Sequence, residues 1–236
     1  MTAAASNSTA EPDSVRRNDR AARLRSPRSD SVVTDTYRSS PELDRGGEED
    51  TISTASNDSG SLDPPIGPYD HVQGVLGSEL SLVEYGDYEC PYCRAAAPVI
   101  EELRRHLGDR LVFAFRHFPL AELHPFALAA ATAAEASALK GQFWPMHAKL
   151  YAGDEPHLTQ ADLRRYAEEI GVPPEKVTWP ATQFVEDRVE ADFNSGVRSG
   201  VRGTPTLFVN GTIYRGPVTV DALLDALQQH PATAES

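Results

Sequence analysis

The chain has 236 residues, of which 40% are hydrophobic, and a formal net charge of −13 at pH 7. Such an acidic protein is a poor partner for nucleic acid or for an anionic membrane surface, because both repel it. No apolar stretch is long enough to span a bilayer. We therefore expect neither a nucleic-acid-binding nor a membrane-spanning protein.

The first quarter of the chain differs in composition from the rest. Residues 1–62 are rich in Ser, Thr, Ala, Asp, Glu and Arg, and their one aromatic residue is Tyr37. This segment buries too little apolar surface to offset its chain entropy, which predicts a disordered, dispensable tail or a docking and phosphorylation segment. Despite the pair Arg16-Arg17, it lacks the apolar region of a secretory signal, so we expect a cytoplasmic protein. The folded domain is expected over residues 63–236.

A strand-to-helix transition holds both cysteines of the chain. Residues 81–85 form a short apolar run typical of a strand, and apolar residues recur at helical spacing over 96–107. Cys90 and Cys93 therefore lie at the start of the helix, and Pro91 occupies an early-helix position that proline tolerates.

This placement favours redox chemistry. The N–H groups and the dipole of a helix N-terminus stabilise a thiolate at Cys90, and Cys93, one turn on, can attack a mixed disulfide formed there. A structural bridge over so short a loop would remove little unfolded-state entropy. A zinc site would need two more ligands. We expect His117, His124 and His147 to be packing or helix-terminal residues, and thus no metal and no cofactor.

The elements after this helix are expected in two groups. Residues 111–115 indicate a buried strand, so that strand, helix and strand form a parallel βαβ unit. About 121–200 shows only helical periodicity and is expected to be a helical insertion. Strands return at 206–209 and 212–215 around an Asn-Gly turn, and 221–229 forms a final amphipathic helix. Weaker signals predict a strand at 71–75 and insertion helices at 125–139, 143–151, 159–170 and 185–201.

Four separated stretches carry motifs that occur together in one family. They are VEYGDYECPYC at 83–93, FRHFPL at 115–120 followed by HP at 124–125, FWPMH at 143–147, and GTPTLFVNG at 203–211. In order and spacing they resemble the DsbA-like branch of the thioredoxin superfamily, over about residues 70–230. The resemblance implies an α/β thioredoxin-like fold with a helical insertion between the βαβ half and the β-hairpin–helix half.

The same resemblance implies roles for individual residues. It makes Cys90 the attacking and Cys93 the resolving thiol of a disulfide oxidoreductase. It also makes Thr204-Pro205 a cis peptide that faces the cysteines, where the backbone of a substrate could pair. Glu84 matches the buried acid beneath the active site. Burial would raise the pKa of this carboxyl and let it relay the proton of the resolving thiol.

The remaining residues near the cysteines refine this hypothesis. Pro91 and Tyr92 are expected to bind substrate with the cis-proline loop, and Asp87 and Glu89 are expected to be surface residues of the site. The Pro-Tyr dipeptide is the one that glutaredoxins carry. It suggests a redox potential of roughly −200 mV, between those of thioredoxin and the strongly oxidising enzymes.

The sequence favours disulfide exchange with protein substrates through the Cys-Pro-Tyr-Cys site. An unidentified thiol reductant or oxidant would recycle this site. Two alternatives stay open. One is a glutathione-linked reductase of small thiols, which the Pro91-Tyr92 pair suggests. The other is a non-enzymatic redox sensor or adaptor that docks through its tail. Repeated turnover of substrate distinguishes an enzyme from a sensor.

Overall fold

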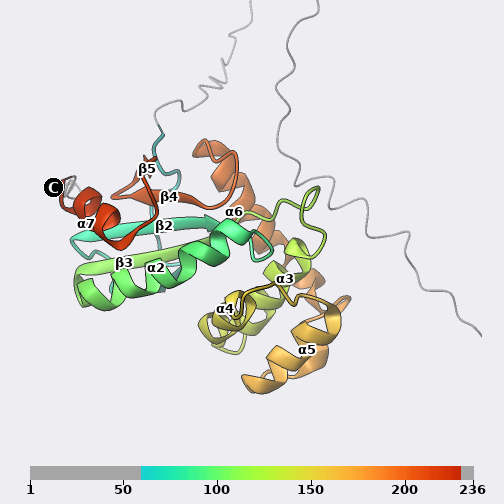
Figure 1. Cartoon of the computed structure of the whole chain (residues 1–236). Helices are drawn as coiled ribbons and strands as arrows, with labels where there is room; N and C mark the ends of the chain where they lie inside the picture. The colour runs from blue at the N-terminus through green and yellow to red at the C-terminus, as the bar shows by residue number, and fades with distance from the viewer. Residues whose placement is uncertain (1–59, 230–236) are drawn as a thin grey trace, which may run out of the picture.

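The computed structural model describes residues 60–229, which fold around one mixed β-sheet (Figure 1). The predicted tail up to residue 59 lies outside the described residues. Within them, the sheet has five strands in the order β1-β3-β2-β4-β5. These are β1 (His71–Gln73), β2 (Leu80–Gly86), β3 (Leu111–His117), β4 (Thr206–Val209) and β5 (Thr212–Tyr214).

The central strand, β2, joins the two halves of the sheet. It pairs in parallel with β3 and antiparallel with β4, while β1 and β5 pair antiparallel at the edges. The expected parallel βαβ unit is therefore confirmed. The strand β3 continues to His117, two residues beyond its expected end, because Tyr85 and Gly86 of β2 still pair with Arg116 and His117.

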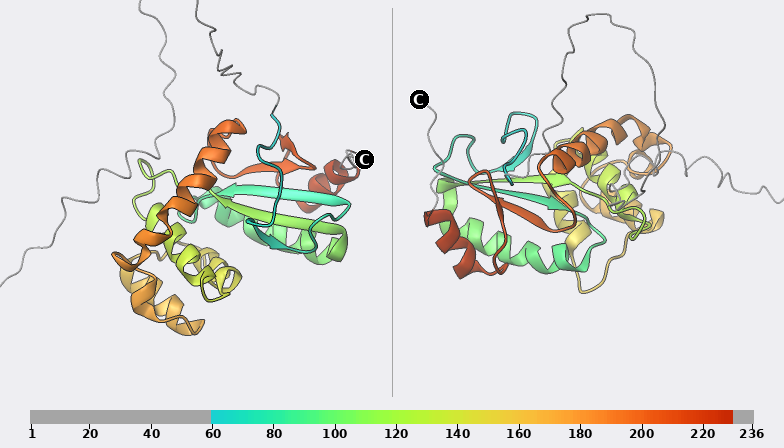
Figure 2. Two further views of the ribbon diagram at one scale, coloured as in Figure 1. Left: turned by 180° about the vertical axis from the view of Figure 1, so that it is seen from behind. Right: turned by 90° about the horizontal axis from the view of Figure 1, so that it is seen from above.

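Side chains of β2 alternate between the two faces of the sheet. Leu82 belongs to the larger core cluster, beneath helix α2 (Pro91–Leu107). Val83 belongs to the smaller cluster on the opposite face. Helix α7 (Val220–Gln229) packs beside α2 and covers the same face of the sheet (Figure 2). Glu84, which alternates with Val83, therefore faces α2.

The stretch between β3 and β4 forms the expected helical insertion, which lies to one side of the sheet (Figure 1). Its first helix is rich in alanine and is buried along most of its length, so that other helices of the insertion pack closely on it. Its third helix begins at a capping box between Thr159 and Asp162. The four helices are α3 (Ala127–Ala138), α4 (Phe143–Tyr151), α5 (Gln160–Glu169) and α6 (Glu186–Arg198). In the described part of the chain, no helix is both long and apolar enough to cross a bilayer.

The first described residues extend the folded domain beyond its expected start at residue 63. The backbone N–H of Leu62 donates to the carbonyl oxygen of Gly211 at 2.8 Å, and that of Ile213 donates to Gly60 at 2.7 Å. Leu62 is also buried in the smaller core cluster. Burying a leucine side chain stabilises a fold by about 1.5–3 kcal/mol. The domain therefore includes residues 60–62, and a cut at residue 63 would weaken it.

Candidate active site

The two cysteines occupy different positions at the start of α2. Cys90 is the N-cap residue, with extended backbone (φ −69°, ψ 122°), Pro91 follows at the first helical position, and Cys93 completes the first turn. Both are free thiols in this structure. Cys90 exposes 3% of its surface and Cys93 exposes none. The two thiols thus differ little in access, because Cys90 is itself largely covered.

Electrostatics separate the two thiols much more strongly. The pKa of Cys90 is lowered to about 5, chiefly because the thiol of Cys93 donates a hydrogen bond to it, with further help from the backbone N–H groups of Cys93 and Tyr92. Burial raises the pKa of Cys93 well above its ordinary value, and donation to Cys90 raises it further. At neutral pH the site thus holds a thiolate at Cys90 and a protonated thiol at Cys93.

Glu84 lies beneath this pair on β2 and is 1% exposed. Burial raises the pKa of its carboxyl to about 8, and the negative charge on Cys90 adds to the shift, while a hydrogen bond with Cys93 opposes it. Its burial on a core strand, rather than at a solvent-facing edge, is confirmed. A carboxyl that titrates near neutral pH beside a thiol can accept or donate the proton of that thiol.

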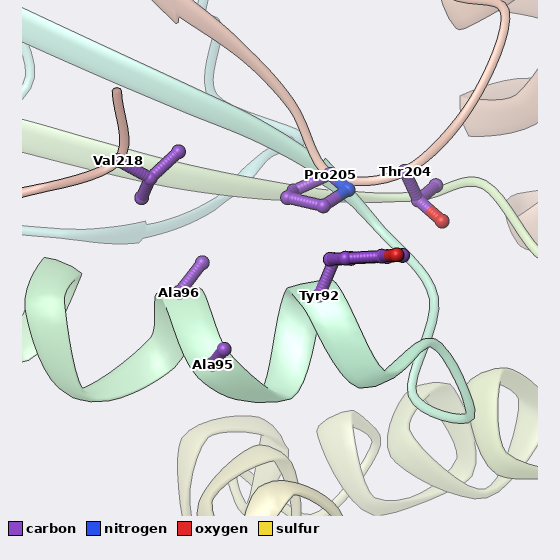
Figure 3. Close-up of a pocket in the computed structure, with 6 residues that line it drawn as sticks. All are labelled: Tyr92, Ala95, Ala96, Thr204, Pro205 and Val218. Carbon is purple, nitrogen blue, oxygen red and sulfur yellow. The ribbon is translucent and has the colours of Figure 1, made fainter.

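The loop before β4 covers Cys90 from the other side. Thr204-Pro205 is a cis peptide, as expected. Sγ of Cys90 lies 3.3 Å from the carbonyl oxygen of Thr204, and it donates a hydrogen bond to that oxygen only when the thiol is protonated. Figure 3 shows Tyr92 and two alanines of α2 facing Thr204, Pro205 and Val218 across a cleft. This cleft has a volume of about 340 Å³. Cys90, the cis-proline loop and Tyr92 are thus brought together.

Asp87 is buried, with 2% exposure, so the expectation that it is a surface residue is wrong. Its carboxylate accepts hydrogen bonds from the backbone N–H groups of Glu89 at 2.8 Å and Leu120 at 2.9 Å, and it pairs with Nδ1 of His124 at 2.8 Å. Its own N–H donates to Sγ of Cys93 at 3.5 Å. These partners offset the cost of burial. Asp87 thus fastens the active-site loop to the start of the insertion.

Replacing Asp87 with alanine is therefore expected to lower the free energy of unfolding by about 3 kcal/mol, since the buried donors lose their acceptor. Urea unfolding of the reduced protein measures this change. The matched control is Glu89→Ala, two residues on, because Glu89 accepts one hydrogen bond, from the N–H of Phe126 at 2.6 Å, and is only partly buried. Equal losses of less than 1 kcal/mol in both variants would contradict this role of Asp87.

His117 and His147 are packing residues, as expected: His117 ends β3 and contacts the insertion, and His147 lies in α4. His117 pairs through Nε2 with Glu135 at 2.9 Å, and His147 lies in an aromatic cluster. Among the described residues, His117, Glu135 and Asp192 place one ligand atom each within 4.8 Å of one another. Asp192 is already held by Arg188 at 2.5 Å and by the backbone N–H of His117 at 3.1 Å. The cluster is thus a buried hydrogen-bond network that includes the ion pair of Arg188 and Asp192.

Two residues of the site had no signal in the sequence. The guanidinium of Arg94, next to Cys93, donates to the carbonyl oxygens of Tyr88, Leu150 and Ala152 at 3.1–3.3 Å and so ties α2 to the end of α4. Tyr151 is the last residue of α4. Burial raises the pKa of its hydroxyl, and the negative charges of Cys93 and Glu84 nearby raise it further. Both contacts join segments more than fifty residues apart, which local periodicity does not reveal.

Comparison with known sequences locates this site within a matched region. A family model described as thioredoxin matches residues 67–229. A Na(+)/H(+) antiporter, NhaA 1, of Mycolicibacterium gilvum is 42% identical over 168 residues, which is 70% of this chain and 27% of that protein. The chain thus spans about a quarter of the length of the curated relatives it matches.

Solved structures show the same fold. BdbD from Bacillus subtilis, in its oxidised form, has a TM-score of 0.60 and 22% identity over 68% of this chain and 91% of that one. The thiol-disulfide exchange protein alpha-DsbA2 from Wolbachia pipientis has a TM-score of 0.58 and 20% identity over 68% and 86%. At these identities the likeness concerns the fold.

Proposed function

This chain belongs to the thioredoxin family, in its DsbA-like branch, and on that basis we propose that it exchanges disulfides with protein substrates through Cys90 and Cys93. Thiol–disulfide oxidoreductases in general have a fold of this kind. The observation that carries the proposal is the opposite shift of the two thiols within one helical turn, since Cys90 has a pKa of about 5 and Cys93 one well above the ordinary value. That asymmetry divides the work between an attacking and a resolving sulfur.

The proposed reaction transfers two electrons and runs in either direction. In reduction, the Cys90 thiolate attacks a substrate disulfide, forms a mixed disulfide and releases one substrate thiolate. Cys93 then gives its proton to ionised Glu84 and attacks Cys90, which releases the second substrate sulfur as a thiolate and leaves a Cys90–Cys93 disulfide. In oxidation, a substrate thiolate attacks this disulfide at Cys90 and forms a mixed disulfide, while Glu84 gives its proton to the departing Cys93 thiolate. A second substrate thiolate then attacks the substrate sulfur of the mixed disulfide, which forms the substrate disulfide and releases the Cys90 thiolate. A thiol reductant or a disulfide oxidant resets the pair.

The proposed substrates are proteins with an extended segment around the reacting cysteine. The cleft beside Cys90 is lined by Tyr92, two alanines, Thr204, Pro205 and Val218, so most of its walls are apolar. Tyr92 is 73% exposed and is therefore available to a partner. An apolar cleft that ends at a reactive sulfur suits the side chains of a polypeptide better than a charged small thiol.

Turnover tests this function. The wild-type protein at substoichiometric concentration is expected to catalyse insulin reduction by dithiothreitol, and Cys90→Ala to remove the catalysis. A protein that forms the disulfide but never turns over insulin would instead be a redox sensor. A rate that depends on glutathione, with glutathionylated peptides far better substrates than insulin, would favour the small-thiol reductase.

The proposal also covers the shared segment of the longer relatives. Those relatives are named as Na(+)/H(+) antiporters, and this chain matches about a quarter of their length. Because the thioredoxin match accounts for residues 67–229, we assign redox chemistry rather than ion transport to this segment. A cytoplasmic location, expected from the sequence, stays a prediction that neither the relatives nor the fold supports.

A further inference from the structure

Several polar atoms near the active site are buried without a hydrogen-bond partner in the structure, and two of them belong to residues that line one cleft. These two are Oε1 of Glu84 and the hydroxyl oxygen of Tyr151. Buried polar atoms are almost always paired, either with protein groups or with ordered water. The space around Glu84 and Tyr151 therefore shows whether water can be the hydrogen-bond partner of these two atoms.

Both residues line a second cleft, between α2 and α4, with a volume of about 320 Å³. Glu84 is at its buried end, whereas Glu101 of α2 and Ala148 of α4 are exposed and lie toward solvent. Pro98 is another exposed residue of its wall. The cleft shares no lining residue with the apolar cleft at Pro205, and its α2 residues lie on a different side of that helix.

We propose that the cleft between α2 and α4 is a water-filled inlet through which Glu84 exchanges its proton with solvent while a substrate covers Cys90. A water molecule occupies about 30 Å³ in the liquid and needs two or more polar partners, so this cleft has room and partners for several. Glu84 and Tyr151, which line the cleft, carry polar groups at its inner end. This inference deepens the proposed function and rests on it.

The reaction requires Glu84 to exchange a proton with solvent in every cycle, and the inlet provides a route for it. During reduction, the proton leaves Cys93 and stays on Glu84, so Glu84 must lose it to water before the next cycle. During oxidation, Glu84 gives its proton to Cys93 and must regain one. A bound substrate lies over the cis-proline loop and closes that side of the site. A second path through water keeps the proton transfers independent of substrate exchange.

Glu84 carries the proton because the other titratable groups on this side of the site keep one protonation state near neutral pH. Cys90 and Cys93 face it from α2, and the Tyr88 and Tyr151 hydroxyls, whose pKa values are raised by burial, stay neutral. His147, on α4, is also neutral because burial lowers its pKa to about 3. At the mouth, Glu101 and Arg104 form an ion pair.

Filling the inlet tests the inference. Ala97→Leu and Ala148→Leu place larger side chains in it from two different helices. Displacing water is expected to raise the pKa of Glu84 by about one unit, as read from a carbon-13 titration of its carboxyl. At pH 7 this lowers the ionised fraction of Glu84 about tenfold, so the resolution of a mixed disulfide slows about tenfold. The control is Ala161→Leu, on the exposed first turn of α5, which should change neither quantity.

The wild-type protein gives a second test that needs no folded variant. In heavy water, the protonated carboxyl of Glu84 should exchange its proton much faster than the amides of β2, as followed by its infrared band. The inference would be overturned if the carboxyl proton exchanged as slowly as those amides. It would also be overturned if both filled variants kept the wild-type carboxyl titration and the wild-type rate of resolution. If Glu84→Gln itself resolved mixed disulfides at the wild-type rate, the relay in the proposed function would fail instead, whatever the exchange rate.

Discussion

Replacing Cys93 with serine is expected to accumulate covalent mixed disulfides between Cys90 and protein substrates, whereas replacing Cys90 with serine should yield none. In the first variant the thiolate of Cys90 still attacks, but no second thiol is present to release the product. In the second, the remaining thiol is fully buried and protonated at neutral pH, because its pKa is raised well above the ordinary value. The expected difference in trapped product is therefore nearly complete.

Two measurements check this division of roles. Non-reducing electrophoresis with mass spectrometry identifies the trapped species, and alkylation of the reduced wild-type protein at about pH 6 reports the reactive thiol. Because the pKa of Cys90 is about 5, most of it is thiolate at that pH, and labelling should fall on Cys90 alone. Equal labelling of Cys90 and Cys93, or trapping by the Cys90 variant, would contradict the assignment.

Replacing Glu84 with glutamine is expected to slow the resolution of mixed disulfides on the order of a hundredfold near neutral pH, at the lower end of what general acid–base groups contribute. The amide keeps the size of the side chain but neither accepts nor gives the proton of Cys93. Stopped-flow measurements of resolution across pH test this, because the wild-type profile should carry a transition near pH 8 that the variant lacks.

The same variant should be more stable than the wild type, and the difference should depend on pH. The pKa of Glu84 is raised from 4.5 to about 8, so the folded state binds the proton more tightly than the unfolded state does. The wild type therefore loses stability, relative to the variant, as pH rises from about 4.5 to 8. The loss between these two pH values reaches roughly 4 kcal/mol.

Urea unfolding of the reduced proteins at pH 4.5 and pH 8 measures the change, with Glu79→Gln as the exposed control one residue before β2. A difference between Glu84→Gln and the wild type that stays constant over this range would contradict the burial of an ionisable carboxyl. An unchanged resolution rate would make Glu84 merely structural.

Local patterns in the sequence predicted the parts of the fold that depend on neighbouring residues. Because side chains alternate along a strand, the expected strand at 81–85 is enough to put Glu84 and Val83 on opposite faces, and they lie so in the structure. The Asn-Gly pair, with Asn210 at a positive φ of 48°, forms the expected turn between β4 and β5. Both features depend on residues within a few positions of one another.

Long-range packing explains what the sequence did not reveal. Asp87 stands among polar and charged neighbours, which suggests a surface residue, yet two of its partners, Leu120 and His124, lie more than thirty positions later. The cleft at Glu84 likewise forms only where α4 packs beside α2. The early boundary at residues 60–62 depends on pairing with β5, and composition alone does not indicate that pairing.

The central claim is that Cys90 and Cys93 form a reversible redox pair, and an equilibrium redox titration against glutathione tests it most directly. We predict a two-electron transition with a midpoint of roughly −200 mV, because a pKa of about 5 at Cys90 lies between those of the thioredoxin and DsbA thiols. A midpoint below about −300 mV, as in structural disulfides, or no two-electron transition at all, would contradict the account.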